Sequence, residues 1–391
     1  MNLLDWLLVA LMATYALSGY WQGFITGAAA TLGLLAGGIF GIWLAPIALG
    51  DAQPSIWVSL GALFIVILAA SLGQAIGQFT GARLREAITW QPIRAVDAVG
   101  GALLSAGAVL IVAWALGLAI SGSRIGAVTT QVRNSTILAE VNGLLPDEAG
   151  DALRGFTDVV GSSVFPRYLE PFARERIVQV SPGPQRMLTD PDVTGAEPSV
   201  LKISGVNRCG RGIEGSGFVY ADNRVMTNAH VVAGVSEPSV WVEGREVTGS
   251  VVLYDPELDI AVIAVDDGGM PRLALDTTAS PRDPVAVLGY PQDGPFRIET
   301  ARVRSQQRLR SPDIYGNGSV LREVFALRAS VRPGNSGGPV LSSQGDVVGM
   351  VFAASVTDSE TGYALTADQL AQSAALGLTN TKPANTGRCT M

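Results

Sequence analysis

The sequence predicts a multidomain protein with an N-terminal four-helix transmembrane region, a short helical linker region and a C-terminal all-β domain of two six-stranded barrels. Two observations lead to this prediction. The first 120 residues are apolar, rich in Ala, Gly and Leu, and hold no Lys or Arg before Arg83. From residue 200 onward, short apolar segments alternate with turns, as in β proteins. At 391 residues the chain has room for three regions, which we place at 1–120, 121–199 and 200–391.

Four apolar runs in the first region are long enough to cross about 30 Å of hydrocarbon as helices. They are residues 3–20, 24–49, 56–80 and 99–120. A secretory signal peptide does not explain the first run, because no basic segment precedes it and three more runs follow. The glycines of the second run either permit close helix contacts or simply make that helix flexible. These glycines are Gly33, Gly37, Gly38 and Gly41.

Basic residues determine the expected topology. Arg83, Arg85 and Arg94 lie between the third and fourth runs, and the positive-inside rule places them in the cytoplasm. Counting spans then puts both termini and the β domain outside the cytoplasm. We therefore expect a multi-pass protein of the cell membrane that contacts lipid through four helices and has its β domain on the periplasmic side. Asp5, Asp97 and Gln74 are polar residues near membrane depth, where such residues are often functional. Asp5 and Asp97 lie near helix ends, so for these two an interfacial position is favoured.

The charge and the set of metal-binding side chains exclude several functions. A net charge of −7 argues against a nucleic-acid partner. One histidine and two distant cysteines cannot build a zinc site, and we expect neither a metal nor another cofactor. The cysteines, Cys209 and Cys389, are either free thiols or, with the β domain outside the cytoplasm, a disulfide. Such a bond would close a loop of about 180 residues, worth roughly 5 kcal/mol at most.

The region between membrane and β domain has two kinds of sequence. Apolar residues repeat at helical spacing over 137–145 and 153–164, which predicts two amphipathic helices that act as a spacer or as an activation or inhibitory segment. Residues 181–199 contain four prolines and are expected to be an exposed linker.

A glycine-rich turn at residues 332–339 presents Ser336 between residues too small to cover it. A hydroxyl that attacks a carbonyl needs open approach and backbone N–H groups that can bind the resulting oxyanion. Glycines on both sides of a serine allow both. Taken alone, Gly-Asn-Ser-Gly-Gly-Pro is also compatible with an ordinary turn, since these are common turn residues.

A general base and an acid accompany this serine. His230, the single histidine of the chain, follows an apolar, strand-like run, a placement that suits a base held on a rigid scaffold. Asp259 precedes the apolar run at 260–265 and would fix the imidazole tautomer. Asp255 and Glu257 are rivals, but both lie in the preceding turn, so Asp259 is favoured.

Order and spacing give a family resemblance. The motifs Thr-Asn-Ala-His-Val-Val, Leu-Asp-Ile-Ala-Val and Gly-Asn-Ser-Gly-Gly-Pro occur in this order, and over residues 198–375 the chain resembles chymotrypsin-fold serine proteases of the bacterial HtrA-like branch. Residues 215–219 and 289–291 match two further landmarks of that branch. The resemblance implies a peptide-bond hydrolase in which His230, Asp259 and Ser336 form the triad. It implies that the N–H groups of Gly334 and Ser336 form the oxyanion hole.

The resemblance also locates the primary specificity pocket. Its base corresponds to Ser330, which gives no support for a Lys or Arg preference, and Val351 and Ala353 on a lining strand suggest small or medium apolar side chains at the cleaved residue. Unlike HtrA proteases, the chain ends about 15 residues after the last expected protease helix, so no PDZ domain is expected.

A second resemblance covers the membrane half. Asn2, Asp5 and the stretches at 19–24 and 94–101 are similar to the colicin V production family of four-helix membrane proteins. Joined to a PDZ-less, disulfide-tied protease, this arrangement resembles the mycobacterial membrane-anchored serine proteases required for acid resistance. That family implies a role in acid and oxidative stress in the periplasm, activation by self-cleavage, and cell-wall hydrolases as substrates. The linker expected at residues 181–199 would be a site for this self-cleavage.

Two other functions remain open at this point. The protease fold would act as a binding module in a non-catalytic membrane stress sensor or scaffold, although the intact triad argues against this. Alternatively, the membrane half would be a transporter, which the scarcity of buried charge makes less attractive.

Overall fold

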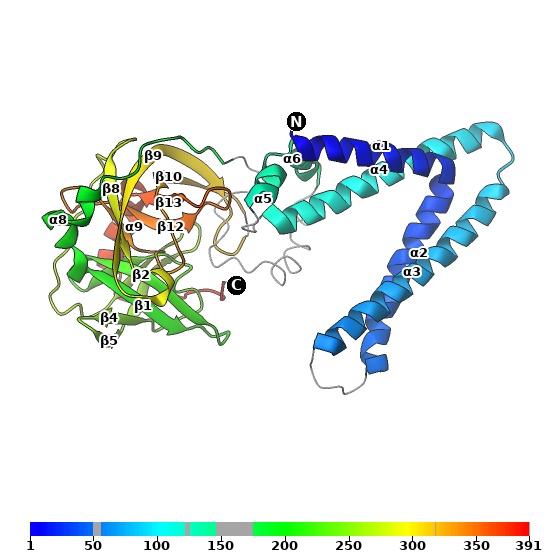
Figure 1. The fold of residues 1–391 in the computed structure, drawn as a ribbon. Coiled ribbons are helices and arrows are strands. Elements are labelled where there is room, and N and C mark those ends of the chain that lie inside the picture. The colour runs from blue at the N-terminus through cyan, green and yellow to red at the C-terminus, as the bar shows by residue number, and fades with distance from the viewer. Residues whose placement is uncertain (50–55, 122–125, 146–174, 317, 391) are drawn as a thin grey trace. The chain divides into compact units, whose positions relative to one another are not determined.

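The computed structural model describes residues 1–49, 56–121, 126–145, 175–316 and 318–390 (Figure 1). The chain forms two compact units. The first comprises residues 1–117 and 135–149, and the second comprises residues 118–134 and 150–391. Each unit is described by itself.

The first unit consists of long apolar helices. Their bounds are α1 (Leu3–Gln22), α2 (Phe24–Leu49), α3 (Ile56–Glu86) and α4 (Gln91–Ser121), followed by the short α6 (Thr136–Leu144). All four predicted runs are helical, and each long helix contains a stretch with mean hydropathy between 1.4 and 2.1, long enough to cross a membrane. Helices α3 and α4 extend beyond their apolar runs. The protein is thus a multi-pass membrane protein.

Helices α2 and α3 lie side by side, with their backbones in contact (Figure 1). A Cβ added to Gly33 would lie 2.1 Å from the carbonyl oxygen of Gly73, and one added to Gly37 would lie 2.3 Å from that of Ala69. A Cβ on Gly41 would lie 2.8 Å from the Val66 Cα, whereas a Cβ on Gly38 would be 4.0 Å from its nearest neighbour. The expected close contacts are therefore made by three of the four glycines.

The turn between α1 and α2 explains one of the polar residues at membrane depth. Asp97 accepts a hydrogen bond from the Ile25 N–H at 2.8 Å and forms an ion pair with Arg85 at 2.7 Å. Gly23, the residue between α1 and α2, has φ +80°, and a Cβ on it would be 2.0 Å from the Asp97 carboxylate. Asp97 is therefore a structural clamp on this turn.

Asp5 has a similar structural role at the start of the chain. Its carboxylate accepts hydrogen bonds from the Ser135 hydroxyl at 2.5 Å and from the Ile137 N–H at 3.2 Å. It also forms a capping box with Asn2. A carboxylate satisfies the unpaired N–H groups of a helix start. Asp5 thereby holds the first turn of α6 against α1.

The linker region differs in part from its prediction. The first expected amphipathic helix is α6, the second lies outside the described residues, and a helix that was not predicted, α5, spans Gly126–Arg133. Residues 181–199 are not an exposed linker. They form η1 (Gln185–Leu188), α8 (Pro191–Thr194) and η2 (Glu197–Ser199), in which Met187 and Val193 are fully buried. The prolines are compatible with this because a first helical turn needs no N–H from them.

Arginines of the β domain hold the segment before these short helices. Arg304 donates to the Val178 carbonyl at 2.8 Å, and Arg328 donates to the Val180 carbonyl at 2.7 Å. Arg302 reaches the carbonyl of Ser181 at 3.1 Å. The folded β domain therefore includes chain well before residue 200.

The first half of the β domain is a seven-stranded antiparallel sheet. Its strand order is β5-β4-β1-β2-β3-β7-β6, one strand more than expected. The strands are β1 (Val200–Val206), β2 (Gly212–Ala221), β3 (Arg224–Thr227), β4 (Ser239–Val242), β5 (Arg245–Thr248), β6 (Ser250–Asp255) and β7 (Ile260–Ala264). Valine and isoleucine side chains from these strands fill its interior.

The second half is a closed six-stranded barrel, as predicted, with the order β10-β13-β12-β11-β8-β9. Its strands are β8 (Pro284–Gly289), β9 (Arg297–Ser311), β10 (Val320–Arg328), β11 (Pro339–Leu341), β12 (Val347–Ala354) and β13 (Thr361–Thr366), and α9 (Ala367–Thr379) follows. A further apolar cluster, which includes Phe218, Leu288 and Phe352, joins the two halves. The loops that carry the predicted site residues leave this junction.

Candidate active site

The single histidine and the favoured aspartate lie in direct contact. Nδ1 of His230 is 2.8 Å and 3.0 Å from the two carboxylate oxygens of Asp259, and the His230 backbone N–H donates to the same carboxylate at 2.9 Å. The His230 side chain is 11% exposed and that of Asp259 is 1% exposed. With Nδ1–H bound to the carboxylate, Nε2 is the nitrogen left to accept a proton.

Strand ends position these two residues. His230 lies in a turn directly after β3, and Asp259 lies directly before β7, which pairs with β3 in antiparallel register. The Asn228 side chain donates to the Asp259 carbonyl at 2.9 Å. Asp259 has φ +62°, a conformation in the left-handed region that few non-glycine residues adopt. The turn therefore holds the carboxylate under backbone strain.

The rival acids have other roles. The Asp255 carboxylate accepts hydrogen bonds from the N–H groups of Glu257 and Leu258, at 3.0 and 2.9 Å, and so closes the turn before β7. The Glu257 side chain is exposed. Neither carboxylate contacts His230 in the described part of the chain.

Ser336 lies in a tight turn between β10 and β11 and is 3% exposed. Its carbonyl accepts a hydrogen bond from the Ser216 N–H at 2.8 Å. Gly337, the next residue, has φ +82°, and a Cβ there would be 2.1 Å from the Ser216 carbonyl oxygen. Among the described residues no hydrogen bond joins the Ser336 hydroxyl to His230. Such bonds are often long in serine enzymes without substrate.

The two residues on either side of Asn335, Gly334 and Ser336, each leave their N–H group free among the described residues. Gly334 has φ +89°, which a residue with a side chain rarely adopts. Two such donors close to a serine hydroxyl are able to bind an oxyanion that forms on the attacked carbonyl.

The residues predicted for the specificity pocket lie in the second barrel. Val351 and Ala353 of β12 are fully buried, so their side chains add no exposed surface to a pocket. The Ser330 N–H donates at 3.0 Å to the carboxylate of Glu299 on β9. Burial raises the pKa of Glu299, while this hydrogen bond and the charge of Arg332 lower it. No local pattern indicates an acid beside Ser330, because Glu299 is 31 residues away along the chain.

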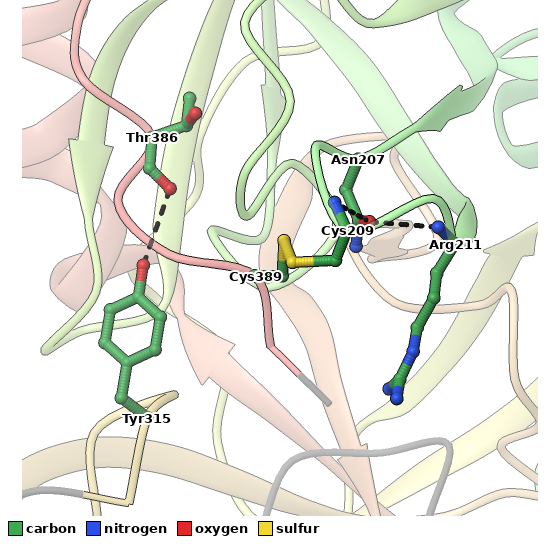
Figure 2. The surroundings of a disulfide bond; sticks show 6 residues. All are labelled: Asn207, Cys209, Arg211, Tyr315, Thr386 and Cys389. Carbon is green, nitrogen blue, oxygen red and sulfur yellow. Dashed lines mark hydrogen bonds between the residues drawn. A yellow bond between two sulfur atoms is a disulfide. The ribbon is translucent and has the colours of Figure 1, made fainter.

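Cys209 and Cys389 form a disulfide, as one of the two alternatives predicted (Figure 2). The bond joins the chain near the end of β1 to the C-terminal tail. In the same tail, the Thr386 carbonyl accepts a hydrogen bond from the Gly234 N–H at 3.0 Å. A Cβ on Gly234 would be 2.9 Å from the Cys389 sulfur. The disulfide therefore packs the tail against the turn that carries His230.

Arg322 is a buried cation that the sequence did not single out. It lies on β10 and is 2% exposed; its Nε donates to the Glu257 carbonyl at 3.0 Å, and its Nη1 donates to the Pro312 carbonyl at 3.1 Å. Burial lowers the pKa of Arg322, and the charge of Asp259 is the strongest influence raising it. The second barrel thus holds the turn of the first sheet that ends in Asp259.

A metal is not needed to explain these contacts. Within the described ranges, no group of three or more His, Cys, Asp or Glu side chains is placed to hold a metal ion.

Two family models match the chain. Residues 215–350 match the trypsin-like peptidase domain, and residues 4–146 match the colicin V production protein. The first match contains His230, Asp259 and Ser336, and the second contains all four long helices.

Named relatives agree with these matches. The chain is 36% identical over 394 aligned positions to the serine protease Rv3671c of Mycobacterium tuberculosis, and the alignment covers 98% of both chains. The crystal structure of that protease in its active form matches with 42% identity and a TM-score of 0.54, covering 57% of this chain and 99% of the crystallised one. A DegP-like probable periplasmic serine endoprotease of Halomonas elongata is 32% identical, over 35% of this chain and 28% of the relative. The chain is therefore a serine protease of the family to which Rv3671c belongs.

Proposed function

We propose that this protein is an endopeptidase that cuts extracytoplasmic proteins, with Ser336 as nucleophile, His230 as general base and Asp259 as the residue that orients the imidazole. The observation that supports this most strongly is the contact of both Asp259 oxygens with His230 Nδ1, at 2.8 and 3.0 Å. Nε2 of His230 takes the proton of the Ser336 hydroxyl as that oxygen attacks the peptide carbonyl. It later gives the proton to the leaving amine. The N–H groups of Gly334 and Ser336 stabilise the oxyanion.

The proposed domains are a four-helix membrane domain over 1–120, a linker region over 121–199, whose last part from Val178 onward packs on the β domain, and a protease domain over 200–391. The protease domain would face the periplasm. Two observations support this orientation: the basic cluster of Arg83, Arg85 and Arg94 marks a cytoplasmic loop, and disulfides such as Cys209–Cys389 persist in oxidising compartments.

We further propose protein substrates cut after small or medium apolar residues, with cell-wall hydrolases as candidates, and a role in acid and oxidative stress. The uncharged side chain of Ser330 supports the apolar preference, whereas Val351 and Ala353 are fully buried and add no surface to a pocket. Because the Glu299 carboxylate lies beside Ser330, substrates with Arg or Lys at the cleaved residue should be compared with substrates that have an apolar side chain there. Self-cleavage would also occur, but not within 185–199, whose buried Met187 and Val193 keep that segment folded.

The test is covalent labelling of the full-length protein in lipid nanodiscs with a fluorophosphonate probe, which reacts with activated serines. Wild type is compared with Ser336→Ala, His230→Ala and the control Ser342→Ala, a serine outside the proposed site. We expect labelling of the wild type and the control and none of the two site variants. Sequencing of any fragment that depends on Ser336 locates the self-cleavage site.

A folded wild-type protein that does not label would favour the non-catalytic sensor or scaffold instead. The orientation is tested separately. An external protease added to intact spheroplasts should degrade the domain after residue 200, and protection of that domain would reverse the proposed topology.

A further inference from the structure

The serine at the centre of the Gly-Ser-Gly landmark, Ser216, holds two backbone carbonyls of the nucleophile turn. Its hydroxyl donates to the Gly334 carbonyl at 2.7 Å, and its N–H donates to the Ser336 carbonyl at 2.8 Å. The same hydroxyl accepts a hydrogen bond from the Tyr290 N–H at 2.9 Å. Ser216 is fully buried on β2. One side chain thus links the first sheet, the nucleophile turn and the loop after β8.

The loop after β8 holds a third carbonyl of the nucleophile turn. The Gln292 N–H donates to the Pro333 carbonyl at 2.6 Å. Gln292 and Asp293 both have positive φ, 57° and 54°, so this loop adopts a specific strained turn. Lys202 of β1 ties the turn down by an ion pair of 2.6 Å with Asp293.

These bonds determine where the two proposed oxyanion donors point. In a trans peptide the C=O and the N–H point in opposite directions. Gln292 holds the Pro333 carbonyl, so the Gly334 N–H of the same peptide faces the other way. The Asn335 carbonyl is likewise bound by the Gly338 N–H at 2.9 Å, which directs the Ser336 N–H.

The peptide group that joins Gly334 to Asn335 lies between the two peptides just described, and Ser216 binds its carbonyl. Its carbonyl, that of Gly334, receives the Ser216 hydroxyl, and its N–H, that of Asn335, donates to the Arg332 carbonyl at 3.0 Å. Gly334 has no side chain to resist rotation about its own φ and ψ. Without the Ser216 hydroxyl, the Gly334 carbonyl and the Tyr290 N–H would both lose a buried partner, and the turn would be free to rearrange.

We propose that the Ser216 hydroxyl is a positioning group for the oxyanion hole. It acts through the Gly334 peptide and the loop after β8, and it does not touch the substrate. This inference rests on the proposed function, because it assigns a role in catalysis by Ser336. It also gives a single physical role to the two landmarks at 215–219 and 289–291.

The test uses the full-length protein in nanodiscs and a p-nitrophenyl ester of blocked alanine as substrate. Removing one oxyanion donor typically costs about 100- to 1000-fold in kcat. Because Ser216→Ala loosens donors without removing them, we expect kcat to fall by about 10- to 100-fold with KM within about 2-fold. A blocked peptide aldehyde, whose adduct places an oxyanion in the hole, should lose affinity by the same factor. The corresponding peptide alcohol should not.

The matched control is Ser199→Ala. Ser199 is also fully buried and donates to a distant carbonyl, that of Pro271, at 2.6 Å, but it does not contact the nucleophile turn. It should lose stability comparably and keep its kcat. Ser216→Cys keeps the shape with a weaker donor, and we expect an intermediate kcat. This variant carries the test should Ser216→Ala fail to fold.

The inference is overturned by a folded Ser216→Ala protein, or in its place Ser216→Cys, whose kcat and aldehyde affinity match those of Ser199→Ala. A wild-type protein with no ester hydrolysis above Ser336→Ala would refute the proposed function itself, and the inference with it. Wild-type activity combined with an unaffected Ser216→Ala would refute the inference alone.

Discussion

Loss of the disulfide should destabilise the protease domain by about 5 kcal/mol. The perturbation is the double substitution Cys209→Ser and Cys389→Ser, which leaves no reactive thiol. The two cysteines are 180 residues apart in sequence, and the loop-entropy relation for a loop of that length gives this value at 25 °C. The bond closes nearly the whole domain, so most of its effect should come from restricting the unfolded chain.

The folded tail should stay in place after this substitution. Its Thr386 carbonyl still receives the Gly234 N–H, and its Ala384 N–H still donates to the Val251 carbonyl at 2.7 Å. Local opening of the tail should become easier, since no covalent bond returns it to the turn that carries His230. We therefore expect a moderate loss of activity beside the large loss of stability.

The assay is equilibrium unfolding of residues 175–391 in urea. This piece contains a single tryptophan, Trp241, whose fluorescence reports the first sheet. The piece is comparable to the share of the chain that matches the crystallised Rv3671c protease. Wild type under oxidising conditions is compared with the double variant and with wild type plus reductant. A loss below about 1 kcal/mol, with unchanged urea dependence, would refute the loop-entropy reasoning.

Three further predictions concern single residues. Gly334→Ala should lower fluorophosphonate labelling by about 100-fold with an unchanged circular dichroism spectrum, because its Cβ would lie 2.3 Å from the Tyr290 carbonyl oxygen; normal labelling would contradict this. Arg322→Met should reduce the free energy of unfolding by about 2–4 kcal/mol in urea, since it leaves the Glu257 and Pro312 carbonyls unpaired, while Arg322→Lys should recover part of it. Burial raises the pKa of Glu299, so this group adds stability below the pKa of an unfolded Glu and loses that contribution as pH rises through its folded pKa. Glu299→Gln should therefore raise Tm at pH 7.5 by about 2 °C, with the difference shrinking toward pH 4, and a constant difference would argue against this explanation.

Local patterns predicted a large part of this protein. The four membrane helices follow from apolar runs alone, because length and hydropathy are local properties. The contact of Asp259 with His230 could be anticipated because each lies at the end of a strand in a recognisable motif. The two cysteines were expected to be either free thiols or a disulfide, and a β domain outside the cytoplasm favours the disulfide that the structure contains.

The parts that sequence could not provide depend on which distant strands come together. Glu299 reaches Ser330, and Arg322 reaches Glu257, only because β9 and β10 close a barrel beside the first sheet. Nothing near either residue signals its partner. The burial of Met187 was missed for a different reason: proline-rich composition is typical of linkers, but here the prolines start short helices whose apolar side chains fill the core.

The contact between α2 and α3 has a mechanical consequence for the membrane half. A Cβ on Gly33 would clash with the Gly73 carbonyl oxygen, and a Cβ on Gly73 would clash with that of Gly33, so no side chain separates the two helices there. Rotation of either helix about its own axis would drive a larger side chain into its neighbour's backbone. The pair should therefore tilt and shift in the bilayer as one stiff rod. A displacement at one end of this helix pair would be carried with little loss to the opposite face of the membrane.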